Sequence, residues 1–284
     1  MNVFKIATYT FILLGMCPGP LLVDNGWASE DATAGDQALT IEEPGELYLP
    51  SEHVMTDLTA VIETARETGK LVLVVMGANW CHDSRGLAAR LQTEPLRSLV
   101  REHYETIFVD VGYLDKGKDV INSLGVPVYY ATPTVLIVDP LSGRLVNAHN
   151  RHLWADADSI SMDDSVKYFR QMSQTDLTTL RTEGEGNADQ AAIMAEIDSF
   201  ERQQADRLYQ AYAVLGPMLK ELKEGDAEKF SEETWNEVRD FRYKVPADVD
   251  ALRASAFEQM AAGKTDIRLD YPEYAPFSWE SEGQ

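Results

Sequence analysis

The stretch Leu71–Arg85, which reads "LVLVVMGANWCHDSR", decides how this sequence folds. Six consecutive apolar residues open it, and three of them are β-branched valines, a composition typical of a strand that is buried on both faces. Gly77 ends the run, and Leu87 and Leu91 then recur at the four-residue spacing of an amphipathic helix. The stretch therefore predicts a buried strand, a short turn and a helix, with Cys81 where the helix begins.

Segments on both sides of this unit alternate between helix and strand patterns. Before it, apolar residues recur at helical spacing until Gly69, a residue typical of a helix end. After it, Pro95 is expected to kink or interrupt the helix, because proline lacks the backbone N–H that the helix needs. The alternating order predicts an α/β fold with a central mixed sheet covered by helices on both faces. The expected strands are 70–76, 106–111 and 134–139, the last followed by a turn and a paired strand at 144–149, and the expected further helices are 115–125 and 163–180.

The last third of the chain shows only helix patterns. One helix of about thirty residues carries an apolar stripe and is disturbed at Gly216–Pro217. A second helix is expected to end before Pro246, and a third to cover 248–262. We therefore predict an all-helical extension at 186–262 and an aromatic, acidic tail at 263–284. The apolar stripes either pack within the chain or form a homo-oligomer interface, and packing within the chain is favoured.

The first 28 residues have the features of a secretory signal peptide. Lys5 supplies a positive charge, an apolar run of about twelve residues follows, and small residues precede a cleavage site after Ala28. The run is too short for a transmembrane helix, which needs about 20 apolar residues. We therefore predict an exported, periplasmic protein. Lipid attachment through Cys17 is disfavoured, because Met16 stands where a lipoprotein signal has a small residue.

Cleavage after the signal peptide would leave Cys81 as the one cysteine of the chain, because the sequence holds only two. The exported protein would then have no structural disulfide and a single unpaired thiol. The segment 29–50 is acidic and lacks periodic apolar residues, so we interpret it as a linker.

Charge and motifs exclude several classes of function. The formal net charge of -22 would repel nucleic-acid phosphates and anionic lipid headgroups. His149 and His152 could supply two metal ligands, but no third ligand has suitable spacing, so we interpret them as loop histidines. No glycine-rich phosphate loop is present. We therefore expect no metal and no cofactor.

The region from about residue 52 to 175 resembles the thioredoxin superfamily. Trp80-Cys81-x-x-Ser84 directly follows a buried strand and begins a helix, as the family's active-site motif does. Thr132-Pro133 lies directly before the next-but-one strand and resembles the cis-proline that faces the active-site cysteine. The order of strands and helices is also similar, most of all to bacterial exported thioredoxin-like proteins with an "NWC" lead-in. The resemblance implies a thioredoxin-like domain at 51–182, followed by the helical extension.

Two departures from the family limit what the resemblance implies. Ser84 stands where the second, resolving cysteine would be, and Val75 stands where thioredoxin has a buried carboxylate that assists proton transfer. Without a second thiol, the chain cannot release a substrate from a mixed disulfide by itself. A dithiol cycle is therefore excluded on chemical grounds.

The setting of Cys81 still suits a nucleophile. A helix amino terminus favours the thiolate, and a thiolate favoured in this way also leaves a mixed disulfide faster. Ser84 could donate a hydrogen bond to the sulfur, and a protonated His82 would stabilise the thiolate unless it simply faces solvent at the helix start. Trp80 is expected to flank the sulfur, with packing in the core as the alternative. Thr132 and Pro133 would pair with an extended substrate segment.

Three hypotheses for the function follow. The first is a monothiol thiol–disulfide exchange protein, in which Cys81 forms a mixed disulfide with a protein or small thiol and an external thiol resolves it. The second is a non-catalytic binding or assembly module with a vestigial cysteine. The third is a disulfide between the Cys81 residues of two copies, because an odd thiol in an oxidising compartment invites one.

Overall fold

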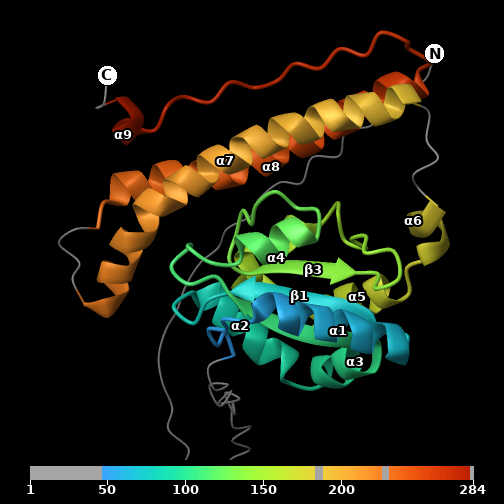
Figure 1. Cartoon of the computed structure of the whole chain (residues 1–284), viewed down its shortest axis with the longest axis vertical. Coiled ribbons are helices and arrows are strands. Elements are labelled where there is room, and N and C mark those ends of the chain that lie inside the picture. The colour runs from blue at the N-terminus through green and yellow to red at the C-terminus, as the bar shows by residue number, and fades with distance from the viewer. Residues whose placement is uncertain (1–46, 183–187, 226–229, 282–284) are drawn as a thin grey trace, which may run out of the picture. The chain divides into compact units, whose positions relative to one another are not determined.

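The computed structural model of this chain describes residues 47–182, 188–225 and 230–281. The signal peptide, Cys17 and most of the predicted linker therefore lie outside the described residues. An α/β domain comes first and a pair of long helices follows it (Figure 1). The α/β domain consists of α1 (Val54–Thr68), β1 (Leu71–Gly77), α2 (His82–Leu91), α3 (Leu96–His103), β2 (Tyr104–Asp110), α4 (Lys118–Ser123), β3 (Thr134–Val138), the 3₁₀ segment η1 (Arg151–Ser159) and α5 (Met162–Ser173).

The sheet has β1 at its centre, with β2 parallel on one side and β3 antiparallel on the other. Every residue of β1 is buried, as its continuous apolar run predicted. Val74 lies at the middle of the register, opposite Ile107 on β2 and Leu136 on β3. The predicted central mixed sheet flanked by helices is confirmed.

The strand predicted at 144–149 is wrong, because only Leu145 forms a bridge to β3. The side chain of Asn147 explains the difference. Its amide oxygen accepts a hydrogen bond from the N–H of Ile137 at 2.8 Å, and its amide nitrogen donates to the carbonyl of Val135 at 2.9 Å. One side chain thus satisfies backbone groups of β3 that a neighbouring strand would otherwise pair.

Pro95 interrupts the helix that begins after Cys81, as predicted. Helix α2 ends at Leu91, and α3 begins directly after Pro95. The helix predicted at 163–180 is shorter: α5 ends at Ser173, and a separate short helix, α6, covers Leu177–Thr182.

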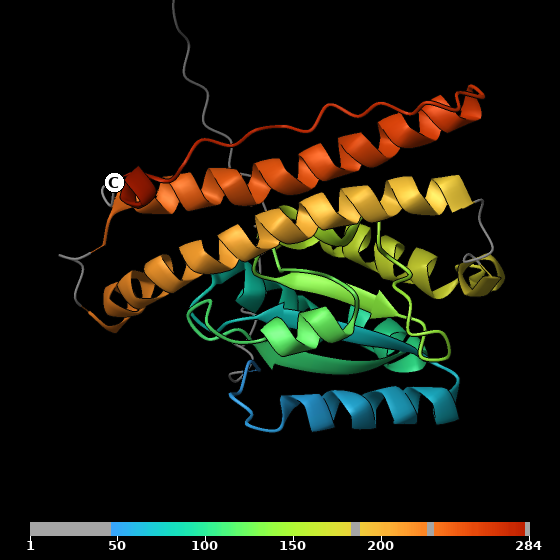
Figure 2. The same cartoon turned by 45° about the horizontal axis from the view of Figure 1, so that its top comes forward.

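Each face of the sheet packs against its own set of helices. On one face, side chains of β1 and β2 form a core with α1 and α4, and this core continues into the two long helices. On the other face, the alternate side chains of β1 pack with α2, α3, η1 and α5. Figure 2 shows the long helices lying over the edge of the domain that carries α4 and β3.

The helical extension consists of α7 (Ala188–Glu224) and α8 (Glu232–Ala261), which lie side by side (Figure 2). Three helices were predicted, but α8 continues through Pro246. The helix tolerates the missing N–H there, because Val245, Val249 and Leu252 bury one continuous stripe on both sides of the proline. No helix in the described part of the chain is both long and apolar enough to cross a membrane.

The apolar stripes of the extension pack within the chain, in agreement with the favoured alternative. Buried residues of both helices belong to the same core as β1. A buried ion network also joins them to the α/β domain: Glu201 of α7 pairs with Arg151 of η1 at 2.9 Å and with Arg253 of α8 at 2.7 Å. The helical pair is thus fastened to the α/β domain by both apolar and ionic contacts.

The described part of the tail lies along the helical pair (Figure 1). Phe277 is buried, stacks on Trp279 and meets the ring of Phe241 edge to face. Arg207 of α7 lies over the rings of Phe241 and Phe277 and pairs with Glu280 at 3.0 Å. These aromatic residues therefore belong to the core of the extension. The short helix α9 (Ser278–Ser281) ends the described chain.

Candidate active site at Cys81

Cys81 lies at the amino end of α2, directly beyond the carboxyl end of β1. Its backbone is extended, with φ -85° and ψ 125°, so it is the residue from which the helix starts. Its N–H donates to the carbonyl of Ala78 at 3.0 Å, and its carbonyl accepts the first helical hydrogen bond, from Arg85 at 3.1 Å. The residue is 9% exposed. The sequence pattern thus places the thiol where free helical N–H groups stabilise negative charge.

Thr132 and Pro133 face this thiol from the loop before β3. The sulfur donates a hydrogen bond to the carbonyl of Thr132 at 3.1 Å, and the hydroxyl of Thr132 donates to the sulfur at 3.4 Å. The Thr132–Pro133 peptide bond is cis. The structure therefore brings together the two segments that the sequence singled out.

Trp80 lies beside Cys81 and is only partly buried. Its indole N–H donates to the carbonyl of Gly112 at 2.7 Å, and its ring stacks on that of Tyr113 with 6.2 Å between the centroids. The segment that follows β2 thus holds the ring of Trp80, the residue that precedes Cys81.

His82 and Asp83 contact η1. The side chain of His82 is 70% exposed, and its Nε2 lies 3.7 Å from the carboxylate of Asp158. The carboxylate of Asp83 accepts a hydrogen bond from the backbone N–H of Asp158 at 2.9 Å. Both side chains thus join the first turn of α2 to η1, in keeping with the alternative of polar residues at a helix start.

Ser84 lies in the first turn of α2 and is fully buried. Within the described part of the chain, its hydroxyl has no hydrogen-bond partner. The expected hydrogen bond from Ser84 to the sulfur is therefore not formed in this state, in which the thiol donates to Thr132. An unpaired buried hydroxyl costs about 1–3 kcal/mol, so any acceptor that comes within its reach is favoured.

Tyr48 is a site residue that the sequence reasoning missed, because it falls in the segment interpreted as a linker. It is 1% exposed, and its hydroxyl donates to the carbonyl of Ser84 at 3.1 Å. Burial, and secondly the nearby charge of Cys81, raise the pKa of Tyr48 well above its ordinary value, so the phenol stays a neutral donor. The aromatic pair Tyr48 and Phe108, 5.6 Å apart, anchors the end of the segment. A tyrosine between two leucines in an acidic stretch was the available signal.

Gly77 is required by the close packing beneath the active-site turn. A Cβ atom there would lie 2.6 Å from the hydroxyl of Ser84 and 2.7 Å from the ring of Tyr48. Val75, which replaces the buried carboxylate of thioredoxin, is fully buried in β1 among apolar neighbours. Gly77 therefore packs directly against a phenol and a hydroxyl, and the strand that ends there is apolar.

Helix α7 contacts the same segments from outside the α/β domain. A Cβ atom on Gly216 would lie 2.4 Å from the carbonyl oxygen of Tyr113, so the helix backbone rests directly on the segment that holds Trp80. The hydroxyl of Tyr212 donates to the carbonyl of Tyr129 at 2.8 Å, close in sequence to Thr132. The extension thus supports both loops that flank the thiol.

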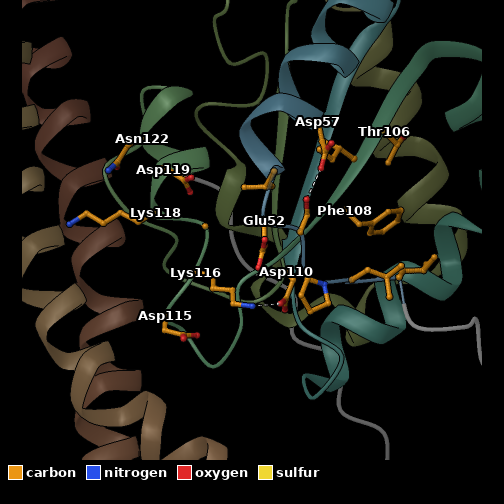
Figure 3. Close-up of a pocket in the computed structure, with 17 residues that line it drawn as sticks. Glu52, Asp57, Thr106, Phe108, Asp110, Asp115, Lys116, Lys118, Asp119 and Asn122 are labelled. Atoms are coloured by element: carbon orange, nitrogen blue, oxygen red, sulfur yellow. Dashed lines mark hydrogen bonds and ion pairs between the residues drawn. The ribbon is translucent and has the colours of Figure 1, made fainter.

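A groove lies elsewhere, along the edge strand β2 (Figure 3). Its volume is about 890 Å³, and it extends from the start of α1 to α4. In this groove the carboxylate of Asp57 accepts a hydrogen bond from the hydroxyl of Ser51 at 2.8 Å. The carboxylate of Asp110 pairs with Lys116 at 3.5 Å (Figure 3). Cys81 does not line it.

The two loop histidines do not form a ligand set. His152 packs its ring edge-on against Tyr130, and burial lowers its pKa to about 3, with the charge of Arg151 as the second cause. Among the described residues, no three histidine, cysteine or carboxylate side chains gather in a way that could hold a metal ion.

Comparisons with known proteins find a family match within the α/β domain. Residues 53–140 match the family model described as thioredoxin-like. A solved structure titled as a disulphide isomerase from Xylella fastidiosa Temecula1 is 26% identical to this chain. The match covers 45% of this chain and 98% of the other chain, with a TM-score of 0.41. The comparison with curated proteins found no match. The family match ends before α7, and the α/β domain that contains it is thioredoxin-like.

Proposed function

We propose that this chain is a monothiol thiol–disulfide exchange protein that acts outside the cytoplasm through Cys81. The observation that carries the proposal is the position of the thiol, at the amino end of α2 and within hydrogen-bond distance of both the hydroxyl and the carbonyl of Thr132. The location rests on the signal peptide expected at residues 1–28.

The proposed reaction conserves the number of disulfides. The Cys81 thiolate attacks one sulfur of a substrate disulfide, forms a mixed disulfide with it and displaces the other sulfur as a thiolate, which takes a proton from solvent. An external thiolate then attacks the substrate sulfur and displaces Cys81. The Ser84 hydroxyl cannot perform this second step, because an alcohol does not reduce a disulfide.

Ser84 supports the reaction in another way. Its buried hydroxyl lies one helical turn from Cys81 and lacks a partner in the resting state. A thiolate no longer donates to Thr132 but accepts hydrogen bonds, and the hydroxyls of Thr132 and Ser84 are donors of the right kind. Two charge-assisted hydrogen bonds would stabilise the thiolate as attacking and as leaving group.

The test is exchange with a mixed disulfide, followed by the release of product at varied glutathione concentration. The wild-type protein should turn over with a rate that depends on external thiol, and C81A should be inactive. S84C supplies the missing second thiol and should release product without glutathione, whereas S84A should still require it. Exchange by C81A equal to that of the wild type would refute the proposal.

A second candidate is a non-catalytic module that binds partners through the thioredoxin-like domain. The low exposure of Cys81, 9%, favours it, because a packed thiol reacts slowly with bulky disulfides. Under this hypothesis C81A captures partners as well as the wild type does. A partner that is retained by the wild type only under non-reducing conditions, and lost from C81A, would exclude it.

A further inference from the structure

A groove lies beside the active-site turn, between the α/β domain and α7. Its volume is about 640 Å³. The α/β domain contributes the rings of Tyr48, Trp80 and Tyr113 to its lining. Helix α7 contributes Ala213 and Pro217, among others. We name this space the α7 groove, and it exists only because the helical extension lies next to the thioredoxin-like domain.

The two sides of the α7 groove are held at a fixed separation. The backbone of Gly216 lies against the carbonyl of Tyr113, with no room for a side chain between them. Tyr113 in turn stacks on Trp80, the neighbour of Cys81. A ligand in this groove would therefore touch the residues that adjoin the nucleophile and a helix that the family match does not include.

The charges around the α7 groove are mainly acidic. Lys116 pairs with Asp110 at 3.5 Å, and Lys220 lies 4.0 Å from Glu224, so each lysine already has an anionic partner. Asp115 also lines the groove and leaves the lining with one negative charge in excess.

The groove along β2 continues this acidic surface. It shares four lining residues with the α7 groove and adds three further carboxylates and one lysine, Lys118. Figure 3 shows the carboxylates along the groove. The shared residues are Pro50, Asp110, Asp115 and Lys116, and the added carboxylates are those of Glu52, Asp57 and Asp119. With a chain charge of -22, this surface disfavours small anionic thiols and favours a cationic ligand.

We propose that the α7 groove binds the polypeptide next to the substrate's reactive sulfur and selects segments that combine an aromatic or aliphatic side chain with lysine or arginine. The inference rests on the proposed function, because it names the substrate class of the same site. The aromatic rings and prolines supply the apolar contact, and the carboxylates favour the basic residues. The two adjoining grooves, of about 640 and 890 Å³, suit an extended segment rather than a single amino acid.

The test uses two matched cysteine peptides, one with phenylalanine and arginine beside the cysteine and one with serine and glutamate. Each peptide carries the same small leaving thiol, and a low-mass neutral disulfide serves as the reference substrate. The wild type should react with the basic peptide about tenfold faster, relative to the reference, than with the acidic peptide, a preference equivalent to a single interfacial contact. Raising the salt concentration should reduce this preference.

Ala213 offers a substitution that alters the groove and leaves the core intact. Its side chain is exposed on α7, and arginine has a good helix propensity, so A213R should fold. The added length and positive charge should reduce the preference for the basic peptide about tenfold. V214R is the matched control, because Val214 is the next residue of α7, is 37% exposed and does not line the groove. It should keep the wild-type preference.

Noncovalent binding separates this inference from the proposed function. The basic peptide with serine in place of its cysteine should bind the wild type and V214R, measured by fluorescence anisotropy, and should bind A213R about tenfold more weakly. Such binding without any Cys81-dependent exchange would support the groove and overturn the proposed reaction. Exchange with the reference disulfide but equal rates for both peptides, or equal behaviour of A213R and V214R, would overturn the groove.

Discussion

The contact of α7 with the active-site segment can be tested by the same substitution at two helical glycines. Gly216 of α7 and Gly86 of α2 are both helical, and replacing a helical glycine by alanine stabilises a protein by about 1 kcal/mol. At Gly86 the new methyl group would meet the carboxylate of Asp158 at 2.9 Å, a side-chain atom that can rotate away. G86A should therefore stabilise the protein by most of this gain of about 1 kcal/mol in helix propensity.

At Gly216 the new methyl group would meet a backbone atom. It would lie 2.4 Å from the carbonyl oxygen of Tyr113, about 1 Å short of an ordinary contact, so the helix or the active-site segment must move. Overpacking of this kind costs about 1–3 kcal/mol. The propensity gain offsets part of this cost, so G216A should be less stable than G86A by about 1–3 kcal/mol, and its net effect should lie between neutral and destabilising by about 2 kcal/mol.

Urea unfolding monitored by circular dichroism measures both variants, with equal slopes required for the comparison. In thermal unfolding the difference should appear as roughly 2–4 °C for each kcal/mol. Because the Tyr113 carbonyl belongs to the segment that holds Trp80, G216A should also slow the proposed exchange at Cys81. If G216A were as stable as G86A, the packing of α7 on the active-site segment would be refuted.

Three further predictions concern the surroundings of the site. E201Q should destabilise the protein by about 3–5 kcal/mol in urea unfolding, because the side chain of Glu201 is 3% exposed and pairs with two arginines. D198N removes a charge from an exposed ion pair and should cost about 1 kcal/mol or less. Equal costs would contradict the role of the buried network. Y48F should lower the stability by about 1 kcal/mol, because it removes a buried donor to helix α2, and an unchanged urea midpoint would show that this hydrogen bond contributes nothing. The two hydrogen bonds from Arg181 hold the pKa of Asp139 well below its ordinary value. Their contribution to stability is therefore present above the unfolded pKa of about 3.9 and is lost as the pH falls through the folded value. D139N should show a shallower loss of stability on acidification than the wild type does, and parallel curves would refute this linkage.

The sequence predicted the parts of the fold that local patterns determine. The apolar run of β1, the helix start at Cys81 and the interruption at Pro95 each depend on a few adjacent residues, and all three are found. The pairing of Cys81 with Thr132 came from the family resemblance, because 51 residues separate them and no local pattern joins them.

The sequence predictions were wrong where tertiary packing replaces a regular element or continues a helix through a proline. Asn147 satisfies the edge of β3 with its amide group, and its neighbours still show a strand pattern. Pro246 is a strong signal for a helix end, but the buried stripe on α8 continues past it. Tyr48 lies in an acidic segment and packs on residues that are more than 30 positions away. Tertiary packing decides all three cases, and it cannot be read from adjacent residues.

Under the proposed function, the hydrogen bonds of Thr132 would couple substrate binding to the reactivity of Cys81. In the resting state the Cys81 thiol donates to the Thr132 carbonyl, the same oxygen that an extended substrate segment would use through its N–H. Loss of the thiol proton removes that donor and places a negative sulfur 3.1 Å from a carbonyl oxygen, which is unfavourable unless another donor binds the oxygen. A substrate N–H is such a donor, and the Thr132 hydroxyl remains available to the sulfur. Under the proposed function, we therefore expect the substrate segment to occupy the Thr132 carbonyl and so release the Cys81 sulfur to attack the disulfide.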